Sequence, residues 1–368
     1  MRPILLLLLA FSATLLPGQA WGRSAEARIA RIDSPVAVLQ QVWVRLDWPG
    51  DARDGQLRIR VARADAPDLG YGFDDLAWSC TLQRPAQTDG PWRCSGDVRA
   101  GDSAPMRLSA DLGPAATGVA LERADARLAL EREAAGPDLT RIDLTRVPLA
   151  WAQALVAQAR EAGRLGAGEL DGQVSVRTAP GEPLAVDADL SVTGGAFETD
   201  DAGAAGEGLD LGARVRFRQP GGTAMAAVDA TLEGGALLFG NAFIDLPDAP
   251  VELRVDAMRD GPGAAWSLPR FEWHDAPALV GRGSAEFSVD GSLRGLELEL
   301  ESDDASLLPA RYLSGWLALA AMDGLHMRGG LDARAVVRDG ALREGRLSVR
   351  GLDLRGQDDR FRFLGLGG

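Results

Sequence analysis

The chain has 368 residues and carries 53 acidic against 39 basic side chains, a net charge of −14. An acidic chain without a basic tract argues against nucleic-acid binding and against electrostatic docking on anionic lipid headgroups. Its only histidines are His274 and His326, far apart in the chain, and no phosphate-binding loop or nucleophile motif is present. We therefore predict that the protein is not an enzyme and has no catalytic residue, cofactor or metal site.

The N-terminus has the pattern of an export signal. Arg2 precedes a predominantly apolar, uncharged stretch at 4–16, and small residues that suit cleavage follow at Ala20 and Gly22. The apolar stretch is too short for a helix that spans a bilayer, which needs about 20 residues. We predict a cleavable signal peptide over residues 1–22 and a periplasmic protein; the alternative is an uncleaved inner-membrane anchor. No cysteine lies at the cleavage site directly after the stretch, which excludes a lipoprotein.

The next region, 23–143, is predicted to be a β region with one disulfide. Trp78-Ser-Cys80 and Trp92-Arg-Cys94 are two matching segments around a loop. Because residues two apart in a strand share a face, a hairpin would bring both cysteines together on one side, and an oxidising compartment would keep the bridge. A small β core packed on the disulfide and an apolar surface that receives acyl chains both remain open as explanations of the clustered tryptophans Trp43, Trp48, Trp78 and Trp92.

Most of the remaining sequence alternates between apolar and polar residues, and turns rich in Gly, Asp and Pro separate the runs. Alternation gives each strand one dry and one wet face, which is typical of antiparallel sheets. The predicted fold is mostly β: a long, antiparallel, strongly curved meander sheet, an open groove, with two short helices. Candidate groove residues on the apolar faces are Val174, Val176, Leu184, Val186, Leu190, Val192, Val215, Phe217, Val251, Leu253, Val255, Leu296, Leu298 and Leu300.

Two segments interrupt the alternation and are predicted to be helices, at 148–162 and 309–322. They are related by a constant offset, and identities fall at the helix start, the helix stop and the entry into the next strand. We interpret this as a repeat of one helix followed by strands, complete over 144–305 and incomplete over 306–368. The two repeat helices begin at Pro148 and Pro309. Their apolar stripes include Trp151 and Leu155 in the first helix and Tyr312 and Trp316 in the second.

The motif Val147-Pro148-Leu149-Ala150-Trp151, followed by Leu165-Gly166-Ala167-Gly168-Glu169-Leu170-Asp171-Gly172 and alternating strands, resembles the AsmA-like clan of bacterial envelope proteins, which includes the TamB and YdbH types. The resemblance covers roughly residues 115–368. The second pass, 308–309 through 329–332, matches more loosely, with Tyr312 in place of the tryptophan. This chain departs from the clan in two ways. Its leader is predicted to be cleavable, whereas clan members usually keep an N-terminal membrane anchor, and the chain is shorter than is typical of the clan.

The resemblance implies a β-groove with an apolar lining that carries phospholipid between inner and outer membrane or supports envelope integrity. Its ligand would be phospholipid acyl chains, and its partners would be envelope proteins or a membrane surface. The alternative is an envelope scaffold or interaction protein whose dry faces pack into a closed β-sandwich that binds no lipid.

Overall fold

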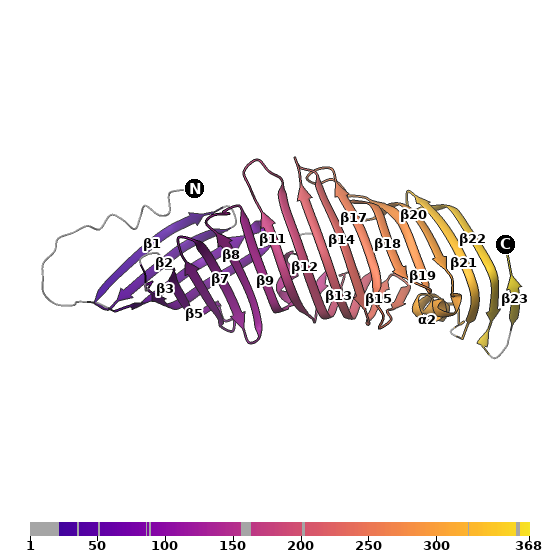
Figure 1. Cartoon of the computed structure of the whole chain (residues 1–368), viewed down its shortest axis with the longest axis horizontal. Helices are drawn as coiled ribbons and strands as arrows, with labels where there is room; N and C mark the ends of the chain where they lie inside the picture. The colour runs from indigo at the N-terminus through magenta and orange to yellow at the C-terminus, as the bar shows by residue number, and fades with distance from the viewer. Residues whose placement is uncertain are drawn as a thin grey trace.

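The computed structural model describes residues 22–34, 37–50, 52–85, 87, 90–155, 163–200, 203–322, 324–357 and 361–368. The predicted signal peptide falls, except for Gly22, outside the described residues. All described strands belong to one hydrogen-bonded antiparallel sheet, which lies extended with its strands side by side in chain order along the long axis (Figure 1). The predicted fold class, a long antiparallel meander that does not close into a barrel, is confirmed.

The N-terminal strands are β1 (Arg23–Asp33), β2 (Val38–Trp48), β3 (Asp54–Ala66), β4 (Tyr71–Gln83), β5 (Trp92–Ala100), β6 (Met106–Leu112), β7 (Ala116–Arg123), β8 (Ala126–Glu133) and β9 (Leu139–Pro148). The middle strands are β10 (Arg164–Leu165), β11 (Glu169–Arg177), β12 (Leu184–Glu198), β13 (Ala204–Gln219), β14 (Ala224–Glu233), β15 (Ala236–Phe239) and β16 (Ala242–Asp245). The C-terminal strands are β17 (Val251–Arg259), β18 (Ser267–Asp275), β19 (Leu279–Phe287), β20 (Leu293–Ser302), β21 (His326–Arg338), β22 (Ala341–Arg355) and β23 (Arg362–Leu366).

The main sheet runs without interruption from β1 to β23. Each of β1 to β8 pairs with the next strand, β9 pairs with β11, and β14 pairs with β17, which leaves the short β10 and the β15–β16 hairpin at one edge. At about 4.8 Å per strand, the path from β1 to β23 covers about 90 Å. The predicted boundary between 143 and 144 falls inside β9, so the disulfide region and the following strands share one ladder.

The short helices lie along one long edge of this sheet, which we call the helix edge. They are the 3-10 helices η2 (Pro67–Leu69), η3 (Leu149–Ala152) and η4 (Ala305–Leu307) and the α-helices α2 (Leu308–Arg311) and α3 (Ser314–Leu319). Figure 1 shows α2 and the β15 strand at this edge. The β15–β16 hairpin lies at the helix edge because β13 is long enough to pair with two strands. Residues 204–207 of β13 pair with β15, and residues 210–218 pair with β14.

The first predicted helix, at 148–162, is described only at its start. It begins as η3, and residues 156–162 lie outside the described residues. Of its expected apolar stripe, Trp151 is half-buried and Leu155 is exposed.

The second predicted helix differs from the structure in detail. It is not one helix over 309–322, because the chain breaks at Tyr312 and Leu313 into α2 and α3. The break changes the helical phase. Trp316, expected on the packed stripe with Tyr312, is 52% exposed, and Leu317 is buried instead.

Local backbone geometry recurs in the two related stretches. Gly168 and its counterpart Gly329 have φ of 119° and 103°, and farther along Gly194 and Gly351 have φ of 61° and 56°. These left-handed conformations suit glycine. At Gly168 an added Cβ would also lie 2.8 Å from the Gly195 Cα. The two stretches therefore bend in the same way where the strands leave the helix edge.

Strand pairing beyond these glycines also has the same register. Leu170 lies opposite Val192 on β12, and Leu331, its counterpart in the second stretch, lies opposite Val349 on β22. The exact domain boundaries, and the interpretation of the second stretch as an incomplete unit, stay predictions.

Candidate functional site

The candidate site is the apolar face of the sheet, which the strand registers join into continuous rows. Directly opposed residues of antiparallel strands share a face, so each row can be followed from strand to strand. The central apolar row is Leu46, Leu57, Cys80, Gly96, Leu108, Leu121, Leu128, Leu144, Gly172, Leu190, Ala213, Ala230, Leu253, Trp273, Gly281, Leu300, Ala333 and Leu347. None of its members, from β2 to β22, is charged.

A second apolar row runs beside the first, from Leu82 and Cys94 to Ala335. It includes Val119, Leu130, Ile142, Val174, Ala188, Val215, Val228, Val255, Phe271 and Leu298. The two rows together form a stripe along the sheet, two side chains wide. The apolar face is therefore continuous both along the strands and across them.

All fourteen predicted groove residues lie on this one face, as the registers require. Thirteen of them are half-buried. The exception is Val251, which has no exposed surface and is packed with Leu232 and Leu246 in a closed cluster. Val251 is thus a core residue, and the strand pattern could not reveal this because its cover comes from a separate hairpin.

The cover of the apolar face is partial. Among the described residues, the buried hydrophobic side chains are Val, Leu, Ala and Cys, and no Trp, Phe, Tyr, Ile or Met is among them. In a closed β-sandwich the interdigitating inner faces would bury the large side chains. Here Val119 and Leu130 of the second row are still 37% and 36% exposed. The face has apolar chemistry without a matching second layer over most of its length.

The disulfide lies on the same face. Cys80 and Cys94 are bonded and are 2% and 4% exposed, so the predicted bridge is confirmed. Trp78 shares the face with Cys80, and Trp92 shares it with Cys94 and contacts Trp48 edge-on at 6.0 Å between ring centroids.

One of the four clustered tryptophans is separated from the other three. Trp43 lies on the opposite face, where its ring packs under Arg60 at 5.4 Å. The four tryptophans therefore lie on two faces of the sheet, because successive side chains of a strand point to opposite faces.

The strands of 23–143 extend the site beyond the predicted groove residues. Leu46, Leu57, Leu108, Leu121 and Leu128 continue the central apolar row from β9 back to β2. Period-two alternation predicts each of these strands, but it does not predict that they share one apolar face with the strands after β9. The shared face depends on the pairing of β9 with β11.

Caps along the helix edge close one side of the apolar face. The β15–β16 hairpin places Leu237 and Ile244 against Leu232 and Leu253. Farther along the sheet, the segment that contains α2 packs against strand residues of β21 and β22. These two caps cover the apolar face along the helix edge, where no second sheet packs on it.

A third cap lies near the N-terminal end of the sheet. The Tyr71 hydroxyl on β4 donates a hydrogen bond to the Trp151 carbonyl in η3. Because β4 and η3 are several strands apart, this contact requires the sheet to curve.

A buried polar group holds α2 on the apolar face. Asp275 is 6% exposed, and it accepts hydrogen bonds from Arg311 Nη1 at 2.7 Å and from the Tyr312 hydroxyl at 2.7 Å. The Tyr312 oxygen in turn accepts from Trp273 Nε1 at 2.9 Å. Burial, together with the bond to Asp275, raises the pKa of Tyr312 above its ordinary value. We call Trp273, Asp275, Arg311 and Tyr312 the latch.

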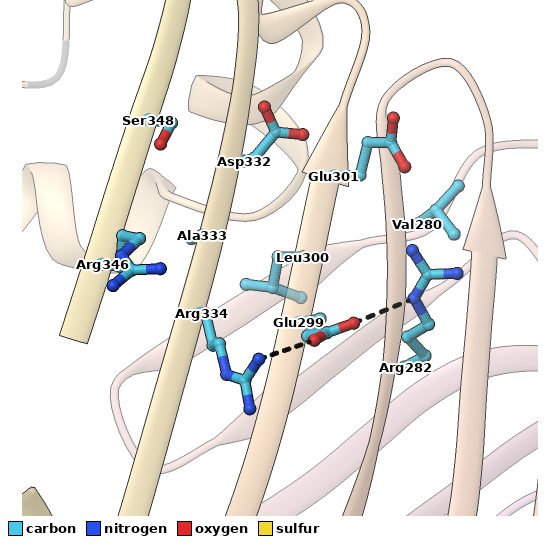
Figure 2. A pocket seen from close by; sticks show the side chains of 10 residues that line it. All are labelled: Val280, Arg282, Glu299, Leu300, Glu301, Asp332, Ala333, Arg334, Arg346 and Ser348. Carbon is cyan, nitrogen blue, oxygen red and sulfur yellow. Dashed lines mark hydrogen bonds and ion pairs between the residues drawn. The ribbon is translucent and has the colours of Figure 1, made fainter. Parts of the chain in front are cut away.

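The opposite face of the sheet is charged, and along one of its rows the charges alternate in sign from strand to strand as far as Arg334. A row that we call the charge ladder consists of Asp189, Arg214, Asp229, Arg254, Glu272, Arg282, Glu299, Arg334 and Arg346. Figure 2 shows its C-terminal end, where Glu299 bridges Arg282 at 3.3 Å and Arg334 at 3.4 Å. Opposite charges on neighbouring strands stabilise this face in water.

The hollow in Figure 2 lies on this charged face. It has a volume of about 210 Å³, and its lining includes Arg282, Glu299 and Asp332. His274 lies at a similar hollow nearby, and His326 begins β21. In the part of the chain that the structure describes, no group of His, Cys, Asp or Glu has an arrangement that could hold a metal ion.

The chain matches no protein-family model, no curated protein and no solved structure. Among the described residues, no helix is both long and apolar enough to cross a membrane.

Proposed function

We propose that the protein binds the acyl chains of phospholipid on its apolar face and acts in the periplasm. Its role there is phospholipid transport between inner and outer membrane or the support of envelope integrity. The proposal rests on one observation: the central apolar row crosses the sheet from β2 to β22 without a charge and is half-covered by protein. Membership of the AsmA-like clan is part of the proposal, supported by the motif at 147–172 and by the long, open antiparallel sheet.

The physical basis is the cost of leaving this face in water. Each methylene that moves from water to an apolar surrounding contributes about 0.8 kcal/mol. An acyl chain laid along the row exchanges water for Leu, Val and Ala side chains on many strands. The headgroup, which is polar, would remain at the margin of the sheet opposite the helix edge. Such a site binds without catalysis, so the proposal includes no enzymatic step.

The location is supported by two features. A leader with the pattern of an export signal precedes the first strand. The buried disulfide between Cys80 and Cys94 suits an oxidising compartment. The partners of the protein would be envelope proteins or membrane surfaces, which exchange lipid with the open margin.

The test measures lipid that co-purifies with the protein expressed with its leader in a Gram-negative host. Val228 and Ala227 are neighbours on β14 whose side chains point to opposite faces, Val228 to the second apolar row and Ala227 to the charged face. We expect phospholipid in the wild type and in Ala227→Asp, and at least a tenfold loss in Val228→Asp, because an acyl chain cannot pair a carboxylate.

Circular dichroism and thermal unfolding establish that both variants fold. A lipid-free wild type overturns the proposal and favours the scaffold alternative. The proposal also fails if folded Val228→Asp retains as much lipid as Ala227→Asp.

A further inference from the structure

One arginine turns to the apolar side of the sheet at the open margin, the long edge opposite the helix edge. Arg259 is the last residue of β17 and lies opposite Ala224 of β14. In the same register Val255 lies opposite Val228, in the second apolar row. Because side chains two apart in a strand share a face, Arg259 points to the apolar side. Its guanidinium therefore lies between the second apolar row and the open margin.

This guanidinium has a stacking partner but no ion pair. It lies over the Trp266 ring, at 5.1 Å from the ring centroid. Its Nε is buried without a hydrogen-bond partner, and no carboxylate of the described residues pairs with it. Arg254 of the same strand, on the charged face, pairs with Glu252 at 3.1 Å. A cation on an apolar surface is unfavourable unless an anion pairs with it, so the position of Arg259 favours an anionic ligand.

The surroundings of Arg259 suit a ligand that is anionic at one end and apolar at the other. Stacking on Trp266 fixes the plane of the guanidinium and leaves its Nη atoms free to donate. A planar guanidinium in this position can donate two parallel N–H bonds to a phosphate group. Ala226 and Ala257, the next opposed pair toward the second apolar row, are small and half-buried. An acyl chain can therefore pass from the margin over these alanines to the larger side chains of the row.

We propose that Arg259 and Trp266 bind the phosphate group of a phospholipid whose acyl chains lie on the apolar face. This inference rests on the proposed function and adds the place and the chemistry of headgroup recognition. The Nη atoms of Arg259 donate to phosphate oxygens, while the acyl chains contact Val228 and Val255. Inorganic phosphate has the same anionic chemistry without an acyl chain, so a comparison of the two separates a lipid site from a site for free phosphate.

A related arrangement occurs near the N-terminal end of the open margin. Arg84, which follows β4, lies over the Trp48 ring at 5.1 Å, and Trp48 is on the apolar side with Leu46 of the central row. In the described part of the chain Arg84 also pairs with no carboxylate. Several strands separate β4 from β17, a path of about 50 Å along the sheet at about 4.8 Å per strand. A test of Arg259 therefore needs a reporter that responds only to a ligand at β17.

The test places such a reporter beside the site. Asp260 is exposed and follows Arg259 directly. Because Cys80 and Cys94 are bonded to each other, Asp260→Cys offers a single free thiol for an environment-sensitive dye. The labelled protein is titrated with dihexanoylphosphatidylethanolamine, with dihexanoylglycerol, which has the same acyl chains, and with inorganic phosphate. We expect the phospholipid to bind at least tenfold more tightly than either of the other two.

Arg259→Gln in the labelled protein should remove this preference, so that the phospholipid and dihexanoylglycerol bind with affinities within a few-fold of each other. Arg254→Gln is the matched control, since it makes the same change on the same strand but on the charged face, and it should keep the preference. Circular dichroism checks that both variants are folded.

Four results would overturn the proposal. In the first, folded Arg259→Gln keeps the preference for the phospholipid. In the second, the labelled protein with Arg259 binds the two lipids equally, which leaves the acyl-chain binding of the proposed function intact. In the third, inorganic phosphate binds as tightly as the phospholipid, which assigns the site to free phosphate. In the fourth, neither lipid binds, and the proposed function then fails together with this inference.

Discussion

At the residue scale, the latch is the place where a charge is buried on the apolar side of the sheet. Asp275 lies two residues after Trp273 and thus points to the apolar side, where an isolated carboxylate would cost several kcal/mol. Arg311 and Tyr312 satisfy it, and both come from the segment between β20 and β21. The latch therefore makes the position of α2 depend on one buried side chain.

Removal of this carboxylate should loosen the cap. We expect Asp275→Ala to lower the free energy of unfolding by about 2–3 kcal/mol, because Arg311 and the Tyr312 hydroxyl lose their common partner in a half-buried site. Glu299→Ala removes an exposed partner of two arginines and should cost less than about 1 kcal/mol. Denaturant unfolding compares the two variants. Equal losses would show that the latch contributes no more than a surface ion pair.

The chain's two tyrosines should report the caps through their ionisation. Burial raises the pKa of Tyr71 as well as that of Tyr312. For a tyrosine, burial penalises the charged tyrosinate, and the folded state therefore favours the neutral, protonated side chain. Ionisation is therefore easier in the unfolded chain, and stability should fall as the pH rises above about 10, the ordinary tyrosine pKa. Absorbance titration should detect tyrosinate at higher pH in the folded than in the denatured protein; coincident titrations would contradict the buried positions.

At the element scale, the strands turn toward the helix edge at glycines that occupy equivalent places in the two related stretches. Gly168 and Gly329 have φ values that L side chains rarely adopt, and backbone atoms crowd the position of an added Cβ. The same bend presents the Gly168 carbonyl to the Leu149 N–H, which donates to it at 2.9 Å at the start of η3. The caps thus depend on backbone conformation as well as on their own packing.

A methyl group at the bend should be costly. We expect Gly168→Ala to destabilise the protein by about 2 kcal/mol or more, through strain at positive φ and the 2.8 Å approach to the Gly195 Cα. Gly118→Ala on β7 is the control, since the nearest atom to its Cβ is 3.8 Å away. Thermal unfolding of the two variants decides the matter. Similar melting temperatures would mean that the bend adjusts without strain.

At the scale of the whole molecule, strands contact mainly their neighbours in the ladder, as in a repeat protein. The largest contacts join β12 to β13 and β21 to β22, and among the described strands the ends β1 and β23 each have a neighbour on one side only. In such a quasi-one-dimensional architecture, stability varies along the chain, since no single core joins all the strands.

Hydrogen exchange should therefore follow position in the sheet. We expect amide protons of β12 and β13 to exchange at least tenfold more slowly than those of β1 and β23, because interior strands open only when two ladders break. Mass spectrometry of peptides across the sheet measures this gradient. Uniform protection from β1 to β23 would indicate one cooperative unit.

Alternation of apolar and polar residues, with the paired cysteines, was enough to predict an antiparallel meander, the faces of its strands and the bridge between Cys80 and Cys94. These features are local: the two-residue period of a strand and the reach of a hairpin determine them. The tertiary structure alone decided that the strands before 143 share the same face, that Trp43 lies on the opposite side and that a hairpin buries Val251. It also decided that the second helix breaks at Tyr312, next to the buried Asp275. Register and cover depend on contacts between distant segments, which a local pattern does not specify.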